Sequence, residues 1–149
     1  MELKIGQKAP DFNALDQNGS PIALADFAGR KLALYFYPKD STPGCTAQAC
    51  NLRDNYDTLR DAGYEVVGVS TDSQKRHQNF IAKNDLPFRL IADEDRQVHD
   101  SYGTWQLKKF MGKEYMGTVR TTFLIDENGV LTDIISKVKT KDHSAQILG

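Results

Sequence analysis

Two cysteines, Cys45 and Cys50, are the only thiols of the sequence, and both lie in the stretch STPGCTAQACN at residues 41–51. A pair of thiols in one short segment fits three kinds of role. They are small apolar residues of a core, part of a zinc site, or a redox couple that alternates between two thiols and a disulfide. The residues around them favour the third interpretation.

The segment has the pattern of a helix start. Thr42 is suited to the N-cap and Pro43 to the first helical position. Cys45 is then the third helical residue, so we expect the Thr42 hydroxyl to lie beside the sulfur or beside whatever the sulfur attacks. The positive end of a helix favours a thiolate. A cation must complete the activation from elsewhere in the fold, because Arg53 lies ~12 Å further along the helix.

Helix geometry also separates the two thiols. Cys45 belongs to an apolar stripe that Cys50 does not share, and the stripe comprises Cys45, Ala49, Leu52, Tyr56 and Leu59. On an intact helix the two Cα atoms are ~8.7 Å apart. A disulfide needs Cα atoms within about 7 Å. The redox interpretation therefore requires the helix to unwind.

Other site chemistries have less support in the sequence. A zinc site needs four ligands, for which only His77, His99 and His143 could supplement the cysteines. A thioredoxin-like disulfide oxidoreductase uses closer cysteines, and a cysteine hydrolase needs a histidine beside the thiol. A non-enzymatic binding module on the same fold also stays open.

Length and composition indicate what kind of protein carries these cysteines. The chain has 149 residues, 40% of them hydrophobic and 26% charged, with a formal charge of −1, which predicts a single domain over residues 1–149. This balance does not suit a nucleic-acid partner. We find no secretory signal and no apolar run long enough for a membrane span, and therefore expect a cytoplasmic protein.

Apolar runs alternate with segments of helical periodicity, which predicts an α/β fold with a mixed sheet flanked by helices. Asn18-Gly19 favours a type I′ turn in an N-terminal β-hairpin. The predicted strands are 31–38, 64–70, 88–93, 121–126 and 130–136. The predicted helices are 43–62, one capped by Asp72 or Ser73, one ending at Gly103, and one at the C-terminus. The strand at 31–38 leads directly into the cysteine segment, at the strand end where such folds bind ligands.

Residues 105–116 have two interpretations. Lys108, Lys109 and Lys113 suit a solvated loop or a docking site for a reductant. The apolar residues among them either line a pocket near the cysteine or anchor the loop, and they are Trp105, Phe110, Tyr115 and Met116.

The segment PKDSTPGCT (38–46) resembles the cysteine signature of peroxiredoxins, and FYPKDSTPGCTAQACNLRD resembles the Q-type branch, also called bacterioferritin comigratory protein. IGQKAPDF, RTTFLID (120–126) and KVKTKDHSAQIL (137–148) are similar to other blocks of that family. The resemblance covers essentially the whole chain and implies a thioredoxin-like fold. Gln48, where the family often has glutamate, and Asp142, where it usually has glycine, depart from the pattern.

The resemblance also implies an activity and a set of roles. It implies a thiol peroxidase for hydrogen peroxide and organic hydroperoxides, which acts in antioxidant defence as a monomer, is recycled by thioredoxin, and needs no metal or organic cofactor. Cys45 would be the peroxidatic cysteine and Cys50 the resolving cysteine. Thr42 would hold the peroxide, Pro38 would shield the pocket, and Arg120 would stabilise the thiolate and polarise the O–O bond. Sequence spacing alone does not distinguish Arg120 from Arg30 or Arg89 in that last role.

Overall fold

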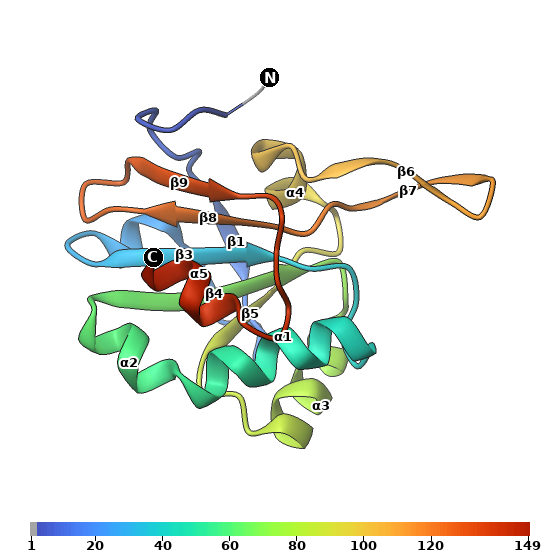
Figure 1. The fold of residues 1–149 in the computed structure, drawn as a ribbon, viewed down its shortest axis with the longest axis horizontal. Helices are drawn as coiled ribbons and strands as arrows, with labels where there is room; N and C mark the ends of the chain where they lie inside the picture. Colours follow the sequence, from blue (N-terminus) through green and yellow to red (C-terminus); the bar gives the residue numbers. More distant parts are fainter. Residues whose placement is uncertain (1–2) are drawn as a thin grey trace.

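The computed structural model describes residues 3–149, which build a mixed sheet with helices on both faces (Figure 1). In chain order the elements are β1 (Asn13–Leu15), β2 (Pro21–Ala23), the 3₁₀ helix η1 (Leu24–Phe27), β3 (Lys31–Phe36), α1 (Pro43–Asp54), α2 (Tyr56–Asp61), β4 (Tyr64–Ser70), α3 (Gln74–Asn84), β5 (Arg89–Ala92), α4 (Gln97–Tyr102), β6 (Trp105–Phe110), β7 (Lys113–Thr118), β8 (Thr121–Ile125), β9 (Leu131–Ile135) and α5 (His143–Leu148).

The central sheet has the order β5-β4-β3-β8-β9. β4 is parallel to β3 and β5, whereas β8 is antiparallel to β3 and β9. The expected mixed α/β sheet is therefore confirmed. None of the helices in residues 3–149 is both long and apolar enough to cross a membrane.

The alternation of side chains along β3 divides the interior into two cores, one on each face of the sheet. Leu32, Leu34 and Phe36 join the core that α4 covers. Ala33, Tyr35 and Tyr37 join the second core, which α1, α2, α3 and α5 cover. The continuous apolar run of β3 thus reflects burial on both faces, and Cys45 belongs to the second core.

The predicted helix at 43–62 is interrupted. Asn55, with φ −112° and ψ 16°, separates α1 from α2, and its side-chain amide donates to the Asn51 carbonyl at 2.9 Å. Such local bonds compete with helix continuation. The predicted stop is correct, since Gly63 has a positive φ of 92°. The apolar stripe is also confirmed across the break, because Leu52 and Leu59 are both fully buried.

The predicted N-terminal hairpin is present, but its turn is not type I′. Ala14 pairs with Ile22, and Leu15 with Pro21, so five residues form the loop. Of the pair Asn18-Gly19, only Gly19 has a positive φ. The Asp16 carboxylate accepts from the backbone N–H groups of Asn18 and Ser20 at 2.9 and 3.0 Å, and this local bonding selects the longer loop.

Residues 105–118 are not a loop but a second hairpin, β6–β7, which projects away from the sheet (Figure 1). Its turn consists of Met111 and Gly112, with φ values of 50° and 79°. Two left-handed residues between paired strands make the turn that a type I′ hairpin requires. Methionine is an unusual residue at this position, so the turn chemistry did not predict it.

Candidate active site

Cys45 lies in the first turn of α1 and is almost completely buried, with 2% of its surface exposed. Its sulfur accepts a hydrogen bond from Nη2 of Arg120 at 3.3 Å. Arg120 lies between β7 and β8, far from Cys45 in sequence. The guanidinium therefore places a positive charge beside the sulfur, at the end of α1 where the backbone N–H groups have no partner within the helix.

Gln48 holds Arg120 in this position. The Nη1 atom of Arg120 donates to Oε1 of Gln48 at 2.5 Å, one helical turn after Cys45. A Cβ at Gly44, the residue before Cys45, would stand 3.4 Å from Nη2, an ordinary van der Waals distance, so the guanidinium lies against the first turn of α1. α1 therefore provides both the sulfur and the amide that the guanidinium contacts.

The amide of Gln48 has a fixed orientation. Because a guanidinium only donates, the amide oxygen must face Arg120, and the buried Nε2 is left without a protein partner. Gln48 is fully buried. As a neutral residue it accepts a hydrogen bond without neutralising the guanidinium, so the positive charge acts on the sulfur.

Thr42 occupies the predicted N-cap position but makes no side-chain cap bond. Its hydroxyl instead donates to the Lys39 carbonyl at 2.8 Å, which closes the loop between β3 and α1. The predicted N-cap position is therefore confirmed, and the hydroxyl's own proton is used within the preceding loop. Pro38 is half-buried at the start of the same loop, after the fully buried end of β3.

Cys50 is half-buried, and both cysteines are free thiols. The Cys50 sulfur lies 3.7 Å from Oδ1 of Asn84 at the end of α3. Arg53 donates to the carbonyl of the same residue at 2.8 Å. The second half of α1 is thus attached to α3, and the intact helix holds Cys50 away from Cys45. This agrees with the expectation that a disulfide requires α1 to open.

The C-terminal helix is attached to α1 beside Cys50. Oδ1 of Asn51 accepts from the backbone N–H of Ser144 at 2.8 Å, and its amide donates to the Lys141 carbonyl at 3.1 Å. His143 is buried next to this contact, where Nε2 lies 2.7 Å from the Thr122 hydroxyl. Burial lowers the pKa of His143, and the charge of Arg120 lowers it further.

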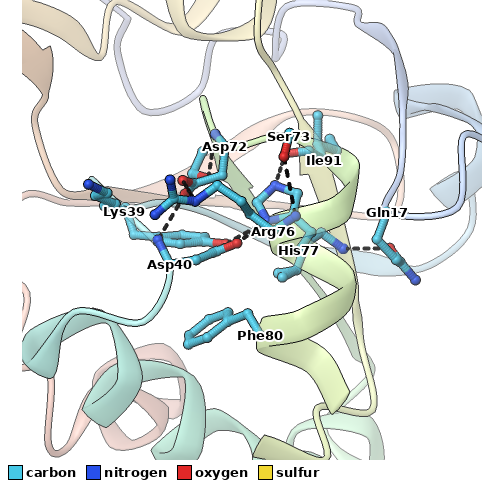
Figure 2. A network of polar contacts seen from close by, with 12 residues as sticks. Gln17, Lys39, Asp40, Asp72, Ser73, Arg76, His77, Phe80 and Ile91 are labelled. Atoms are coloured by element: carbon cyan, nitrogen blue, oxygen red, sulfur yellow. Dashed lines mark hydrogen bonds and ion pairs between the residues drawn. The ribbon is translucent and has the colours of Figure 1, made fainter. Parts of the chain in front are cut away.

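A buried polar network holds the loop that precedes α1 (Figure 2). Asp40 binds His77 Nδ1 at 2.6 Å and accepts from the Tyr37 hydroxyl at 2.5 Å. The backbone N–H of Asp40 donates to Asp72 at 2.8 Å. Nε2 of His77 lies 2.9 Å from the Ile91 carbonyl, which only accepts, so this nitrogen carries a proton. Sequence analysis missed this network, because no local signal links residues that are this far apart.

Among residues 3–149, one cluster has donor atoms close enough for a metal ion, and it consists of Asp40, Asp72 and His77. Its donor atoms are already engaged in the hydrogen bonds of the network, so the bonding there is complete without an ion. The cluster contains no cysteine. The zinc interpretation of the sequence therefore has no support in the geometry.

The remaining histidine, His99, is buried and forms hydrogen bonds within the fold. Its ring nitrogens lie 2.6 Å from Asp93 and 2.9 Å from the Thr118 hydroxyl. Burial by itself would raise the pKa of Asp93, but the hydrogen bonds from His99 and from the Val98 backbone outweigh it and lower the pKa.

The two arginines that sequence spacing could not distinguish from Arg120 form ion pairs with other residues. Arg30 pairs with Glu65, and Arg89 pairs with Asp16.

Comparison with known proteins adds independent evidence. The model of the AhpC/TSA family matches residues 5–134. Peroxiredoxin Bcp of Bacillus subtilis is 46% identical over 148 residues, which cover 99% of this chain and 94% of that protein. Peroxiredoxin Bcp of Escherichia coli K12 is 47% identical over 146 residues, which cover 98% and 94%.

Solved structures agree with these relatives. Peroxiredoxin Q of Xylella fastidiosa superposes with a TM-score of 0.92 at 27% identity, covering 99% of this chain and 94% of that one. The bacterioferritin comigratory protein of Xanthomonas campestris, studied for its alkyl peroxide reduction activity, superposes with a TM-score of 0.89 at 33% identity and covers 97% and 95%.

Proposed function

The chain belongs to the AhpC/TSA family, among the Bcp-type peroxiredoxins, and from this premise we propose that Cys45 is the sulfur that attacks the peroxide. As a peroxiredoxin the protein is a thiol-dependent peroxidase, with a peroxide as substrate and a thiol as reductant. The observation that carries the assignment of Cys45 is its contact with Arg120, 3.3 Å from the sulfur at the start of a helix. Within residues 3–149, the hydrogen-bond partner of the Cys50 sulfur is the neutral side chain of Asn84.

In the first step the Cys45 thiolate attacks the terminal oxygen of the peroxide. The S–O bond forms as the O–O bond breaks, and the leaving oxygen takes a proton and departs as water or an alcohol. Cys45 becomes a sulfenic acid, oxidised by two electrons. Arg120 stabilises the thiolate before attack and the negative charge that develops on the leaving oxygen.

Thr42 and Pro38 form the peroxide side of this site in our proposal. The Thr42 hydroxyl donates its own proton to Lys39, and its lone pairs remain able to accept a hydrogen bond from the peroxide O–H. Pro38, at the start of the same loop, shields the pocket from solvent. Both roles depend on the loop that the Asp40–His77 network holds in place.

In the second step Cys50 attacks the sulfenic sulfur, a disulfide forms, and water leaves. This step requires α1 to open, because the intact helix separates the thiols. A dithiol then reduces the disulfide, and we propose thioredoxin as its physiological source. A monomeric state and a cytoplasmic location stay predictions.

The test is peroxide consumption with thioredoxin, thioredoxin reductase and NADPH. We expect Cys45→Ser to abolish turnover, and Cys50→Ser to complete about one round, after which Cys45 is oxidised further to irreversible acids. Mass spectrometry detects those products directly. Full turnover of Cys50→Ser would contradict the role of Cys50, and activity of Cys45→Ser would contradict the whole assignment.

A loss of helical far-UV circular dichroism on oxidation is expected from the opening of α1. The Cys50→Ser variant is the matched control, because it is oxidised without forming the intramolecular disulfide. An unchanged spectrum of the oxidised wild type would contradict the unwinding step.

A further inference from the structure

The β6–β7 hairpin is attached firmly at its base. Trp105 packs edge-on against the buried His99 ring, with centroids 6.0 Å apart. Nε2 of His99 lies 2.9 Å from the Thr118 hydroxyl, and the Val119 N–H donates to the Thr104 carbonyl at 2.8 Å. These contacts fix the direction in which the hairpin leaves the molecule.

The outer half of the hairpin is exposed and apolar. Of the eight exposed large hydrophobic residues in the described part of the chain, five lie here, namely Leu107, Phe110, Met111, Tyr115 and Met116. The Met111 side chain, at the tip, is 87% exposed. A two-stranded ribbon has no core of its own, and a cluster of exposed apolar side chains marks an interaction site. Methionines suit such a surface because they adapt to a partner.

The hairpin is also basic. Lys108, Lys109 and Lys113 against Glu114 give residues 105–118 a formal charge of +2. The whole chain carries −1, so the remaining residues carry −3. An acidic partner complements this surface, whereas two hairpins of like charge repel each other.

The hairpin is next to the active site in sequence and in space. β7 ends at Thr118, two residues before Arg120, which contacts the Cys45 sulfur. The hairpin projects from the side of the molecule where α1 begins (Figure 1). A protein bound to the hairpin would therefore lie on the side of the molecule where α1 begins.

From this placement we propose that the β6–β7 hairpin is the docking surface for the protein dithiol that reduces the oxidised active site. The partner has an apolar face with acidic residues around it. This inference rests on the proposed function. In the reaction, a thiolate of the partner attacks one sulfur of the Cys45–Cys50 disulfide and forms a mixed disulfide. The second partner thiol then displaces it, leaving two thiols on this chain and a disulfide on the partner.

Two double variants of the hairpin test the proposal. Phe110→Ser with Met111→Ser removes apolar surface, and Lys109→Glu with Lys113→Glu reverses charge. The matched controls change similar residues away from the hairpin. They are Ile5→Ser, which is 62% exposed in the wild type, and Lys4→Glu with Lys8→Glu, both exposed.

Each protein is assayed with thioredoxin and, in parallel, with dithiothreitol, which is too small to need a docking surface. We expect both hairpin variants to lower kcat/KM for thioredoxin at least tenfold, with dithiothreitol-supported turnover unchanged. The controls should match the wild type with both reductants. Added salt should slow the wild type with thioredoxin and leave the dithiothreitol reaction unchanged.

Three results would overturn the proposal. The first is that both hairpin variants keep the wild-type kcat/KM for thioredoxin. The second is that the variants lose activity equally with thioredoxin and with dithiothreitol, which indicates damage to the catalytic site. The third is a dimer that forms through the hairpin in sedimentation experiments, while the hairpin variants keep wild-type kinetics with thioredoxin.

A wild-type protein that is inactive with both thioredoxin and dithiothreitol would instead contradict the proposed function. Calorimetry of thioredoxin binding then tests docking separately, with lost binding in the hairpin variants supporting it and unchanged binding overturning it.

Discussion

At the residue scale, we expect the reactivity of Cys45 to depend on how one guanidinium divides its hydrogen bonds. Arg120 donates to the sulfur with one nitrogen and to Gln48 with another. The neutral amide positions the guanidinium while leaving its charge available. A carboxylate in the same position would keep the hydrogen bond but would neutralise the charge and add a negative group near the thiolate.

Gln48→Glu is therefore expected to slow the reaction of Cys45 with hydrogen peroxide about tenfold, equivalent to about 1.4 kcal/mol in activation free energy. Stopped-flow measurement of the first oxidation gives the rate constant. Gln97→Glu, at an exposed position of α4, controls for net charge. A Gln48→Glu rate equal to that of the wild type would show that the amide only holds Arg120 in place.

At the element scale, the proposed mechanism requires α1 to perform two functions that oppose each other. In the reduced state the intact helix presents Cys45 in its first turn, and its contacts with α3 and α5 stabilise it. In the oxidised state the same helix must open. The contact with α5 lies beside Cys50 and next to the buried His143, so we expect the stability of this region to depend on pH.

The lowered pKa of His143 predicts the sign of that dependence. Below the unfolded-state pKa, about 6.5, the unfolded chain binds a proton that the native imidazole resists, so stability falls as the pH decreases. Urea unfolding between pH 8 and pH 5 measures this decline. His143→Gln, which keeps a polar side chain, should show a shallower decline; an identical slope would contradict the prediction.

At the scale of the whole molecule, one sheet separates two cores, and its strands tolerate little change in volume. Gly68, in the centre of β4, faces Tyr35 of β3 and Leu90 of β5. A Cβ there would lie 2.7 Å from a Leu90 methyl carbon and 2.8 Å from the Tyr35 ring. Because both cores share this sheet, we expect residues 1–149 to unfold as a single domain.

Gly68→Ala should reduce the free energy of unfolding by about 1–3 kcal/mol, the usual cost of overpacking a core. Thermal unfolding followed by far-UV and near-UV circular dichroism measures this cost, and the two transitions should coincide. Gly117→Ala is the control, because its neighbours are the Lys108 and Tyr115 side chains of the exposed hairpin. An equal effect of both substitutions would argue against overpacking as the cause.

Features that depend on local pattern can be predicted from the sequence alone. Apolar runs predict the buried strands β3 and β4. For α3 the sequence offers Asp72 or Ser73 as the cap, and the structure has Ser73. Gly103 marks the end of α4, and Pro43 marks the start of α1. The position of Cys45 in the first turn of that helix followed from capping rules alone. These properties rest on backbone conformation and periodicity, which neighbouring residues set.

Which distant residues meet is known only from the tertiary structure. It brought Arg120, rather than Arg30 or Arg89, to the Cys45 sulfur, and it joined Asp40 to His77 beneath the loop before α1. It also turned residues 105–118 into a projecting hairpin whose base rests on His99. Such contacts depend on how strands are ordered in the sheet and which faces the helices cover, and the spacing of residues along the chain does not encode these directly.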